Sequence, residues 1–157
     1  MPRKGKVKKR ERYPDYFYNS TLVSQLINGV MRDGKKSTAS RIVYESMEKV
    51  KKSKKEDPLK IFEQAINNIK PLLETKSRRV GGATYQVPVE VEDKRGLSLA
   101  IRWLLNFSKQ RPGKSMVDRL SAEILEAADN KGGSIKKRED THRMAKANRA
   151  FAHFARY

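Results

Sequence analysis

Few side chains in this sequence could support catalysis. The only two histidines, His142 and His153, lie near a basic C-terminus, where an imidazole beside phosphate is a better interpretation than a general base. Glu90, Glu92 and Asp93 could bind a divalent cation, but Asp93 directly precedes a helical pattern and is more simply explained as a helix cap. Cysteine is absent, which excludes disulfides and thiolate metal sites. We therefore expect no catalytic residue, no metal site and no cofactor.

Positive charge dominates the composition. The chain of 157 residues carries 36 Lys and Arg against 18 Asp and Glu, a formal net charge of +18. Like charges at this density oppose compaction, and a polyanion relieves the repulsion because neutralised phosphates release condensed counterions. Nucleic acid is therefore the expected partner. No apolar run approaches the roughly 18 residues of a membrane helix, and no apolar segment follows the basic start, so we expect neither a membrane span nor a secretory signal.

The elements that must position these charges are mostly helical. Apolar residues recur at helical spacing in six segments, which cover about residues 20–34, 39–55, 57–70, 97–107, 115–128 and 135–147. Asp57 before a proline predicts the start of the third helix, and Ser115 with Asp118 predicts a capping box for the fifth. Ser134 is in position to cap the last helix.

One segment has the period of a strand. From position 85 to 91 apolar and polar residues alternate, and Gly81-Gly82 suits a tight hairpin turn. Pro88 cannot donate to a ladder, which favours an isolated hairpin. The sequence predicts a mostly α fold in one domain over residues 1–157, a bundle of about six helices with a projecting β-hairpin over 72–91. We expect a disordered basic arm over 1–17 and a C-terminal tail over 148–157.

The segment RRVGGATYQVPVEV at residues 78–91 resembles the hairpin motif of the small ribosomal subunit protein seven family, bacterial type. Further segments resemble the family in the same order, and these are MRDGKK at 31–36, DPL at 57–59, RWL at 102–104, KKREDTHRMA at 136–145 and ANRAFAH at 147–153. The resemblance extends from about Tyr18 over nearly the whole chain. Lys146 and the C-terminal end, residues 153–157, depart from the family pattern, and the end is longer by one residue.

The resemblance implies a structural, cytoplasmic ribosomal protein that is neither an enzyme nor a functional homo-oligomer. It implies direct binding to 16S rRNA as a primary binder of the 3′ major domain, and nucleation of assembly of the subunit head. The hairpin and the C-terminal segment would lie near exit-site tRNA and mRNA, with small-subunit proteins nine and eleven as neighbours. In some bacteria the family also represses translation of its own messenger.

The candidate contacts combine this resemblance with the distribution of charge. Arginine supplies forked donors for phosphate, and tyrosine supplies a stacking face. The residues that we expect to bind rRNA are Arg3, Lys4, Lys6, Lys8, Lys9, Arg10, Lys35, Lys36, Lys76, Arg95, Arg102, Arg111, Lys114, Arg119, Lys136 and Arg143. The residues that we expect near tRNA and mRNA are Arg78, Arg79, Gly81, Gly82, Tyr85, Arg149 and His153. For any one of them, an ordinary solvated surface charge is the alternative.

Two other functions are compatible with the residues alone. A helix bundle with basic edges could be an architectural DNA-binding protein, and competition between duplex DNA and junction RNA distinguishes the two. An RNA-processing enzyme would need turnover that is lost when Glu92 or His142 is changed.

Overall fold

The computed structural model of the chain describes residue 5 and residues 13–156. Six α-helices lie within these residues, namely α1 (Thr21–Val30), α2 (Lys36–Lys54), α3 (Pro58–Ile69), α4 (Asp93–Gln110), α5 (Met116–Ala128) and α6 (Gly133–Ala147). The hairpin of β1 (Leu73–Val80) and β2 (Ala83–Glu90) lies between α3 and α4, and a 3-10 helix, η1 (Arg149–Arg156), follows α6. The predicted mostly α class with one hairpin is confirmed. Six residues of the expected basic N-terminal arm lie outside the described residues, namely Arg3, Lys4, Lys6, Lys8, Lys9 and Arg10.

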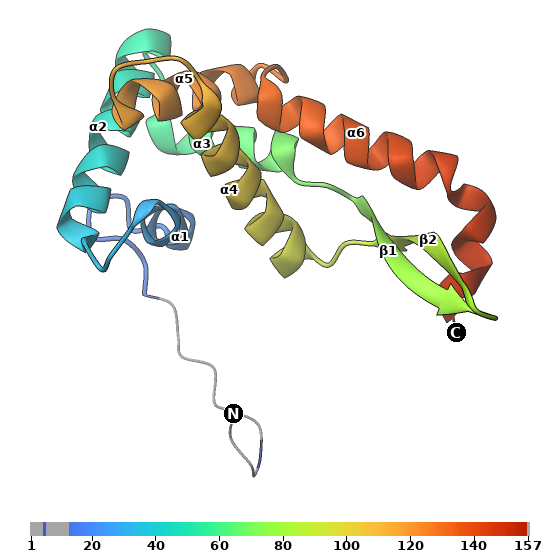
Figure 1. Cartoon of the computed structure of the whole chain (residues 1–157). Helices are drawn as coiled ribbons and strands as arrows, with labels where there is room; N and C mark the ends of the chain where they lie inside the picture. Colours follow the sequence, from blue (N-terminus) through green and yellow to red (C-terminus); the bar gives the residue numbers. More distant parts are fainter. Residues whose placement is uncertain (1–4, 6–12, 157) are drawn as a thin grey trace.

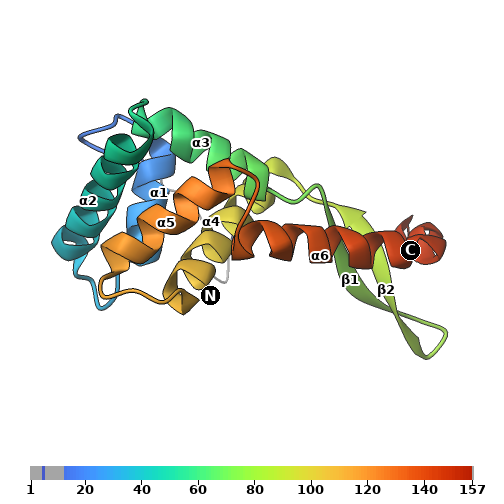
Figure 2. The ribbon, with the colours of Figure 1, turned by 90° about the horizontal axis from the view of Figure 1, so that it is seen from above.

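The molecule has a helix bundle and a projecting part, called the arm from here on, which is distinct from the basic N-terminal segment expected at residues 1–17. Helices α1 to α5 gather into the bundle, whereas α6 and the hairpin extend away from it on one side (Figures 1 and 2). At the far end of α6 the chain turns back, and η1 packs against β2. The segment expected as a C-terminal tail is therefore part of the arm. Every helix in the described part of the chain is too short or too polar to span a lipid bilayer.

The core follows from the apolar faces that the helical periodicity predicts. Leu26 of α1, Phe62 of α3, Leu104 of α4 and Ile124 of α5 are all fully buried in one cluster. Helix α5 packs against α2, α3 and α4, so it is the central helix of the bundle. Removing these side chains from water stabilises the bundle, at about 1.5–3 kcal/mol for each large apolar side chain.

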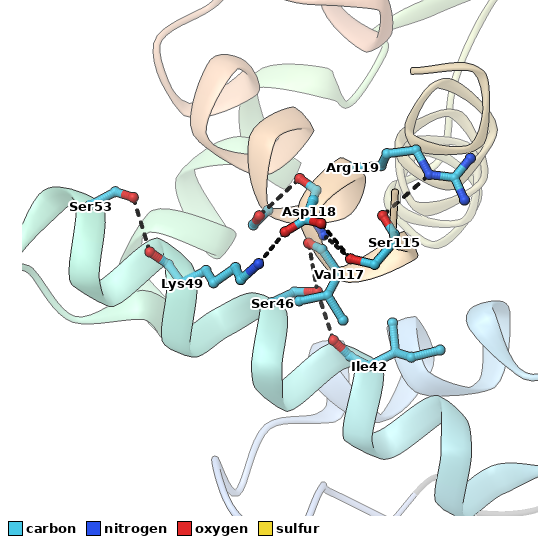
Figure 3. A network of polar contacts seen from close by, with 9 residues as sticks. Ile42, Ser46, Lys49, Ser53, Ser115, Val117, Asp118 and Arg119 are labelled. Carbon is cyan, nitrogen blue, oxygen red and sulfur yellow. Dashed lines mark hydrogen bonds and ion pairs between the residues drawn. The ribbon is translucent and has the colours of Figure 1, made fainter. Parts of the chain in front are cut away.

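Two predicted helix starts are confirmed. The side chain of Asp57 accepts a hydrogen bond from the Leu59 amide at 3.0 Å, and the Ser115 hydroxyl accepts one from the Asp118 amide at 3.2 Å. The Ser115 cap belongs to a network of polar contacts between α2 and the start of α5, which Figure 3 shows. There the Ser46 hydroxyl donates to the Val117 carbonyl at 3.3 Å across the two helices.

Two predicted caps are wrong, because each side chain has a partner far away in the sequence. Asp93 is the first residue of α4 and caps nothing, and its carboxylate lies 2.5 Å from the Lys70 ammonium. Helix α6 begins at Gly133, two residues earlier than predicted, and Ser134 does not cap it. Instead the Ser134 amide and hydroxyl both donate to the buried carboxylate of Glu123, at 3.0 and 2.5 Å.

The hairpin has the predicted turn. Val80 pairs with Ala83, and the two residues between them, Gly81 and Gly82, have φ of 57° and 90°. Positive φ at both turn positions matches the right-handed twist of the flanking strands and favours glycine. Pro88 faces Thr75 in this two-stranded ladder. The tip lies far from the bundle (Figure 2).

Candidate nucleic-acid interface

The turn between α1 and α2 presents two lysines to solvent. Helix α1 ends at Val30, and Asp33 and Gly34 turn the chain with φ of 53° and 73°. Lys35 and Lys36 follow, and both side chains are exposed. Neither lysine has an ion-pair partner among residues 13–156. Their charges are therefore free to neutralise an external anion.

Other predicted cations lie on the surfaces of helices and loops. Arg102 on α4, Lys114 before α5 and Lys136 on α6 are exposed, and none of them forms an ion pair within the described residues. Arg143 is also exposed, and its only ion-pair partner there is Asp140 at 2.7 Å, one helical turn away. Arg119 is half-buried and donates to backbone carbonyls of its surroundings. An exposed pair within one helix contributes little, so Arg143 stays available to phosphate.

Arg95 joins the base of the hairpin to α4. Its guanidinium donates to both carboxylate oxygens of Glu74 on β1, at distances of 2.7 to 2.9 Å. Lys76 lies 3.3 Å from the same carboxylate, which is only 10% exposed. The hydrogen bond from Arg95, more than that from Lys76, lowers the pKa of Glu74. Arg95 is itself 52% exposed, but the ion pair with Glu74 neutralises much of its charge and joins β1 to α4.

Arg111 has an internal role that its sequence context did not predict. Its guanidinium lies 2.6 Å from Glu123, whose side chain is 1% exposed, and it also pairs with Glu126. Burial alone would lower the pKa of Arg111, but the hydrogen bonds to these two carboxylates raise it. Because Glu123 also accepts from Ser134, this cluster joins the end of α4 to α5 and the start of α6. Arg111 therefore positions the arm.

The hairpin and η1 bring the second group of predicted residues together. Arg79 is exposed and Arg78 half-buried, next to the glycine tip. The ring of Tyr85 lies 5.1 Å from the rings of both Phe151 and Phe154 of η1. The face that we expected to stack on bases is thus packed against the protein's own C-terminal segment.

On η1 itself, Arg149 and His153 are exposed. The His153 ring lies 3.9 Å from that of Phe154, and its Nδ1 is 2.9 Å from the Ala150 carbonyl. Because η1 packs on β2, these two side chains share the arm with the arginines of the hairpin.

The residues considered for catalysis are dispersed. His142 is half-buried, and its Nε2 accepts a hydrogen bond from the Leu72 amide at 3.0 Å. Burial, and then the positive charge of Arg138, lower the pKa of His142. Within the described residues no group of three or more acidic or imidazole side chains gathers to hold a metal ion.

An aromatic loop before α1 was missed from the sequence. Asp15, 9% exposed, accepts hydrogen bonds from the amides of Phe17 and Tyr18 at 3.1 and 3.2 Å, so the end of the expected basic N-terminal arm, from residue 15 on, forms a hydrogen-bonded loop. Tyr13, Tyr16 and Phe17 remain exposed. Four aromatic residues among positions 13–18 were the signal that could have predicted this loop.

Comparison with known proteins decides the family. The family model for ribosomal protein S7p/S5e matches residues 2–149. The chain belongs to this family. Proteins called small ribosomal subunit protein uS7 are similar to it over 98% of the chain and 99% of their own length. They include those of Thermodesulfovibrio yellowstonii at 60% identity, Thermoanaerobacter pseudethanolicus at 59% and Dictyoglomus thermophilum at 57%.

Membership in the S7p/S5e family confirms the resemblance found at residues 78–91 and the segments around them. It makes the chain a structural ribosomal protein that binds RNA and takes part in translation. The alternative of an RNA-processing enzyme is wrong, because the family is one of structural proteins.

Proposed function

We propose that the protein binds 16S rRNA directly, as a primary binder of the 3′ major domain, and so nucleates assembly of the small-subunit head. The observation that carries this proposal is the spread of exposed cations without an ion-pair partner among residues 13–156. They occur at the α1–α2 turn (Lys35, Lys36) and on α4 and α6 (Arg102, Lys136). A basic surface spread over bundle and arm suits a multi-helix RNA junction, which is read by shape and backbone.

The test is titration of the full chain against a transcribed 3′ major domain fragment at several salt concentrations. We expect the double substitution Lys35→Ala/Lys36→Ala to weaken binding about tenfold and, because two phosphate contacts are lost, to reduce the salt slope by about 1.8. The bundle should remain folded, because both side chains are exposed.

A matched control removes the same charge elsewhere. Lys49 and Lys54 pair with Asp118 and Asp129, so Lys49→Ala/Lys54→Ala should bind the fragment like the unchanged chain. Equal affinity of the two double variants for the fragment would show that the α1–α2 turn does not contact the RNA. Equal competition by duplex DNA would instead favour the architectural DNA-binding function.

We further propose that the hairpin and η1 lie at the subunit interface near exit-site tRNA and mRNA. Support comes from the exposed side chains of Arg79 on β1 and of Arg149 and His153 on η1, together on a slender arm. The tip is also open to its surroundings, because a methyl group added at Gly81 or Gly82 would meet no atom within 4 Å beyond the adjoining residues. A two-stranded tip can enter a cleft that is closed to a helix bundle.

Subunits reconstituted with Arg78→Ala/Arg79→Ala test this placement. We expect unchanged affinity for the rRNA fragment and weaker binding of tRNA at the exit site, because phosphate contacts are lost only at the tip. Lys76→Ala is the control on the same strand, since Lys76 already pairs with Glu74. Loss of rRNA binding in the double variant would instead make the hairpin the primary contact.

Three finer assignments complete the proposal. Small-subunit proteins nine and eleven are the neighbours, with eleven at the C-terminal segment, as the family resemblance implies. Cross-linking in assembled subunits tests this placement of the two neighbours.

The cytoplasmic ribosome is the proposed location of the protein. The basic surface also represses translation of the protein's own messenger, and a reporter fused to that messenger should escape repression by Lys35→Ala/Lys36→Ala.

A further inference from the structure

A hollow of about 810 Å³ lies where the chain enters the bundle. The loop over residues 13–16 forms one wall, α1 and the first half of α2 form the others, and α4 contributes at one side. The lining combines aromatic rings with amides, hydroxyls, the cation Lys36 and the carboxylate of Asp15, and contains only a few aliphatic groups. This mixture differs from the apolar grooves that receive amphipathic helices.

The aromatic wall of the hollow is held in place from behind. The buried carboxylate of Asp15 accepts from two loop amides through one oxygen and from the Tyr44 hydroxyl at 2.6 Å through the other. The Asp15 amide donates to the Ser20 carbonyl at 3.1 Å. Tyr16 lies within this hydrogen-bonded loop and yet is 94% exposed, and Tyr13 just before the loop is 79% exposed. A large ring that an ordered loop leaves in water is expected where the ring contacts a partner.

We propose that this hollow binds an unpaired base of RNA. The base stacks on Tyr16, its edge hydrogen-bonds to the amides of Gln25 and Asn28, and the adjoining phosphate lies beside Lys36. All four residues line the same hollow. This inference deepens the proposed binding of rRNA and rests on it. The basic surface recognises the shape and backbone of double-stranded RNA, and the hollow would add recognition of one unpaired base.

The composition of the hollow favours a nucleotide over a protein segment. Every base has a π-face for an aromatic ring, polar edges for an amide and a phosphate for a lysine. Tyrosine, amide and lysine all occur on its walls, on a chain with a net charge of +18. A protein segment would need a larger continuous apolar lining.

Photo-cross-linking of the full chain tests the proposal. The probe is a short single-stranded oligouridine with one 5-iodouridine, and a duplex RNA of equal length is the comparison. We expect cross-links at Tyr13 or Tyr16. Tyr16→Leu should bind the single strand about tenfold more weakly, because a stacking face is lost, with duplex binding unchanged. Tyr16→Phe keeps the ring and should bind like the unchanged chain. Because Tyr16 is 94% exposed, neither substitution disturbs the core.

Two results would overturn the inference. Cross-links confined to other segments, with unchanged affinity of Tyr16→Leu, would mean that no base occupies the hollow. If particles reconstituted with Tyr16→Leu lack a subunit protein while the variant binds single-stranded RNA with unchanged affinity, the hollow is a protein-docking site. In both cases the 3′ major domain fragment still binds. Failure of the unchanged chain to bind that fragment would refute the proposed function itself.

Discussion

The Nε2 atom of His142 on α6 accepts a hydrogen bond from the backbone amide of Leu72, 3.0 Å away. Leu72 directly precedes β1, so one imidazole joins α6 to the base of the hairpin. The bond requires an unprotonated Nε2. Burial and the charge of Arg138 favour that neutral form and lower the pKa of His142.

The His142 bond predicts a dependence of the arm on pH. In the unfolded chain the imidazole has a pKa of about 6.5 and binds a proton more readily than in the folded protein. Stability from this residue is therefore present above about pH 6.5 and decreases as the pH falls toward the lower folded pKa. With each exchange rate normalised to the intrinsic amide rate at that pH, we expect a smaller protection factor of the Leu72 amide at about pH 5.5 than at about pH 7.5, together with a smaller free energy of unfolding.

Two matched variants assign this effect. His142→Gln should remove the part of the pH dependence that comes from this site, whereas His153→Gln should keep it, because His153 is exposed. A pH dependence that disappears with His153→Gln and persists with His142→Gln would contradict the role of the Leu72 bond.

The ion pair of Arg111 with Glu123 should be required for stability. Arg111→Met leaves a carboxylate that is 1% exposed without its charge partner, and we expect a loss of about 3 kcal/mol in the free energy of unfolding. Arg143→Met breaks an exposed pair within one helix and should cost less than about 0.5 kcal/mol. Urea denaturation measures both values. A cost at Arg111 as small as that at Arg143 would mean that the Glu123 cluster does not hold α6.

Local patterns were sufficient to predict most of the fold. Apolar spacing predicted the six helices, and alternation around Gly81-Gly82 predicted the hairpin and its turn. The caps at Asp57 and Ser115 were predictable because a cap bonds an amide two or three residues away. Each of these features depends on neighbours in the sequence.

The errors occurred where a side chain has a distant partner. Asp93 and Ser134 stand at positions that suit caps, but Lys70 and Glu123 bind them instead. Arg111 resembles any surface cation in the sequence, since nothing local marks its carboxylate partners as buried. The sequence therefore predicted which cations form the candidate site. It could not predict which of them are neutralised by carboxylates of the same chain, because that depends on how the helices pack.

The Ser115 cap predicts a measurable helix contribution. Ser115→Ala removes the acceptor for the Asp118 amide at the first turn of α5, and we expect a loss of about 1 kcal/mol in the free energy of unfolding. Ser53→Ala is the control in the same polar region (Figure 3), because its exposed hydroxyl donates to the Lys49 carbonyl of its own helix and caps no helix start. Thermal or urea denaturation compares them, and equal stability of both variants would contradict a capping role.

The aromatic cluster of Tyr85, Phe151 and Phe154 should control the arm without affecting the bundle. Phe154→Ala removes a ring 5.1 Å from Tyr85, and aromatic pairs contribute about 0.5–1.5 kcal/mol each. We expect η1 to detach from β2, with faster hydrogen exchange in β2 and faster proteolysis beyond α6. The unfolding of the bundle should not change, because the cluster lies on the arm and outside the bundle core.

Tyr85→Phe is the matched control for this cluster, since it keeps the ring and should retain the protection of β2. If the proposed place of the arm is correct, Phe154→Ala should also weaken exit-site tRNA binding in reconstituted subunits, because Arg149 and His153 of η1 would no longer be held beside the hairpin. Normal β2 protection in Phe154→Ala would show that the hairpin is rigid without the C-terminal segment, and the packing of η1 would then have no part in positioning it.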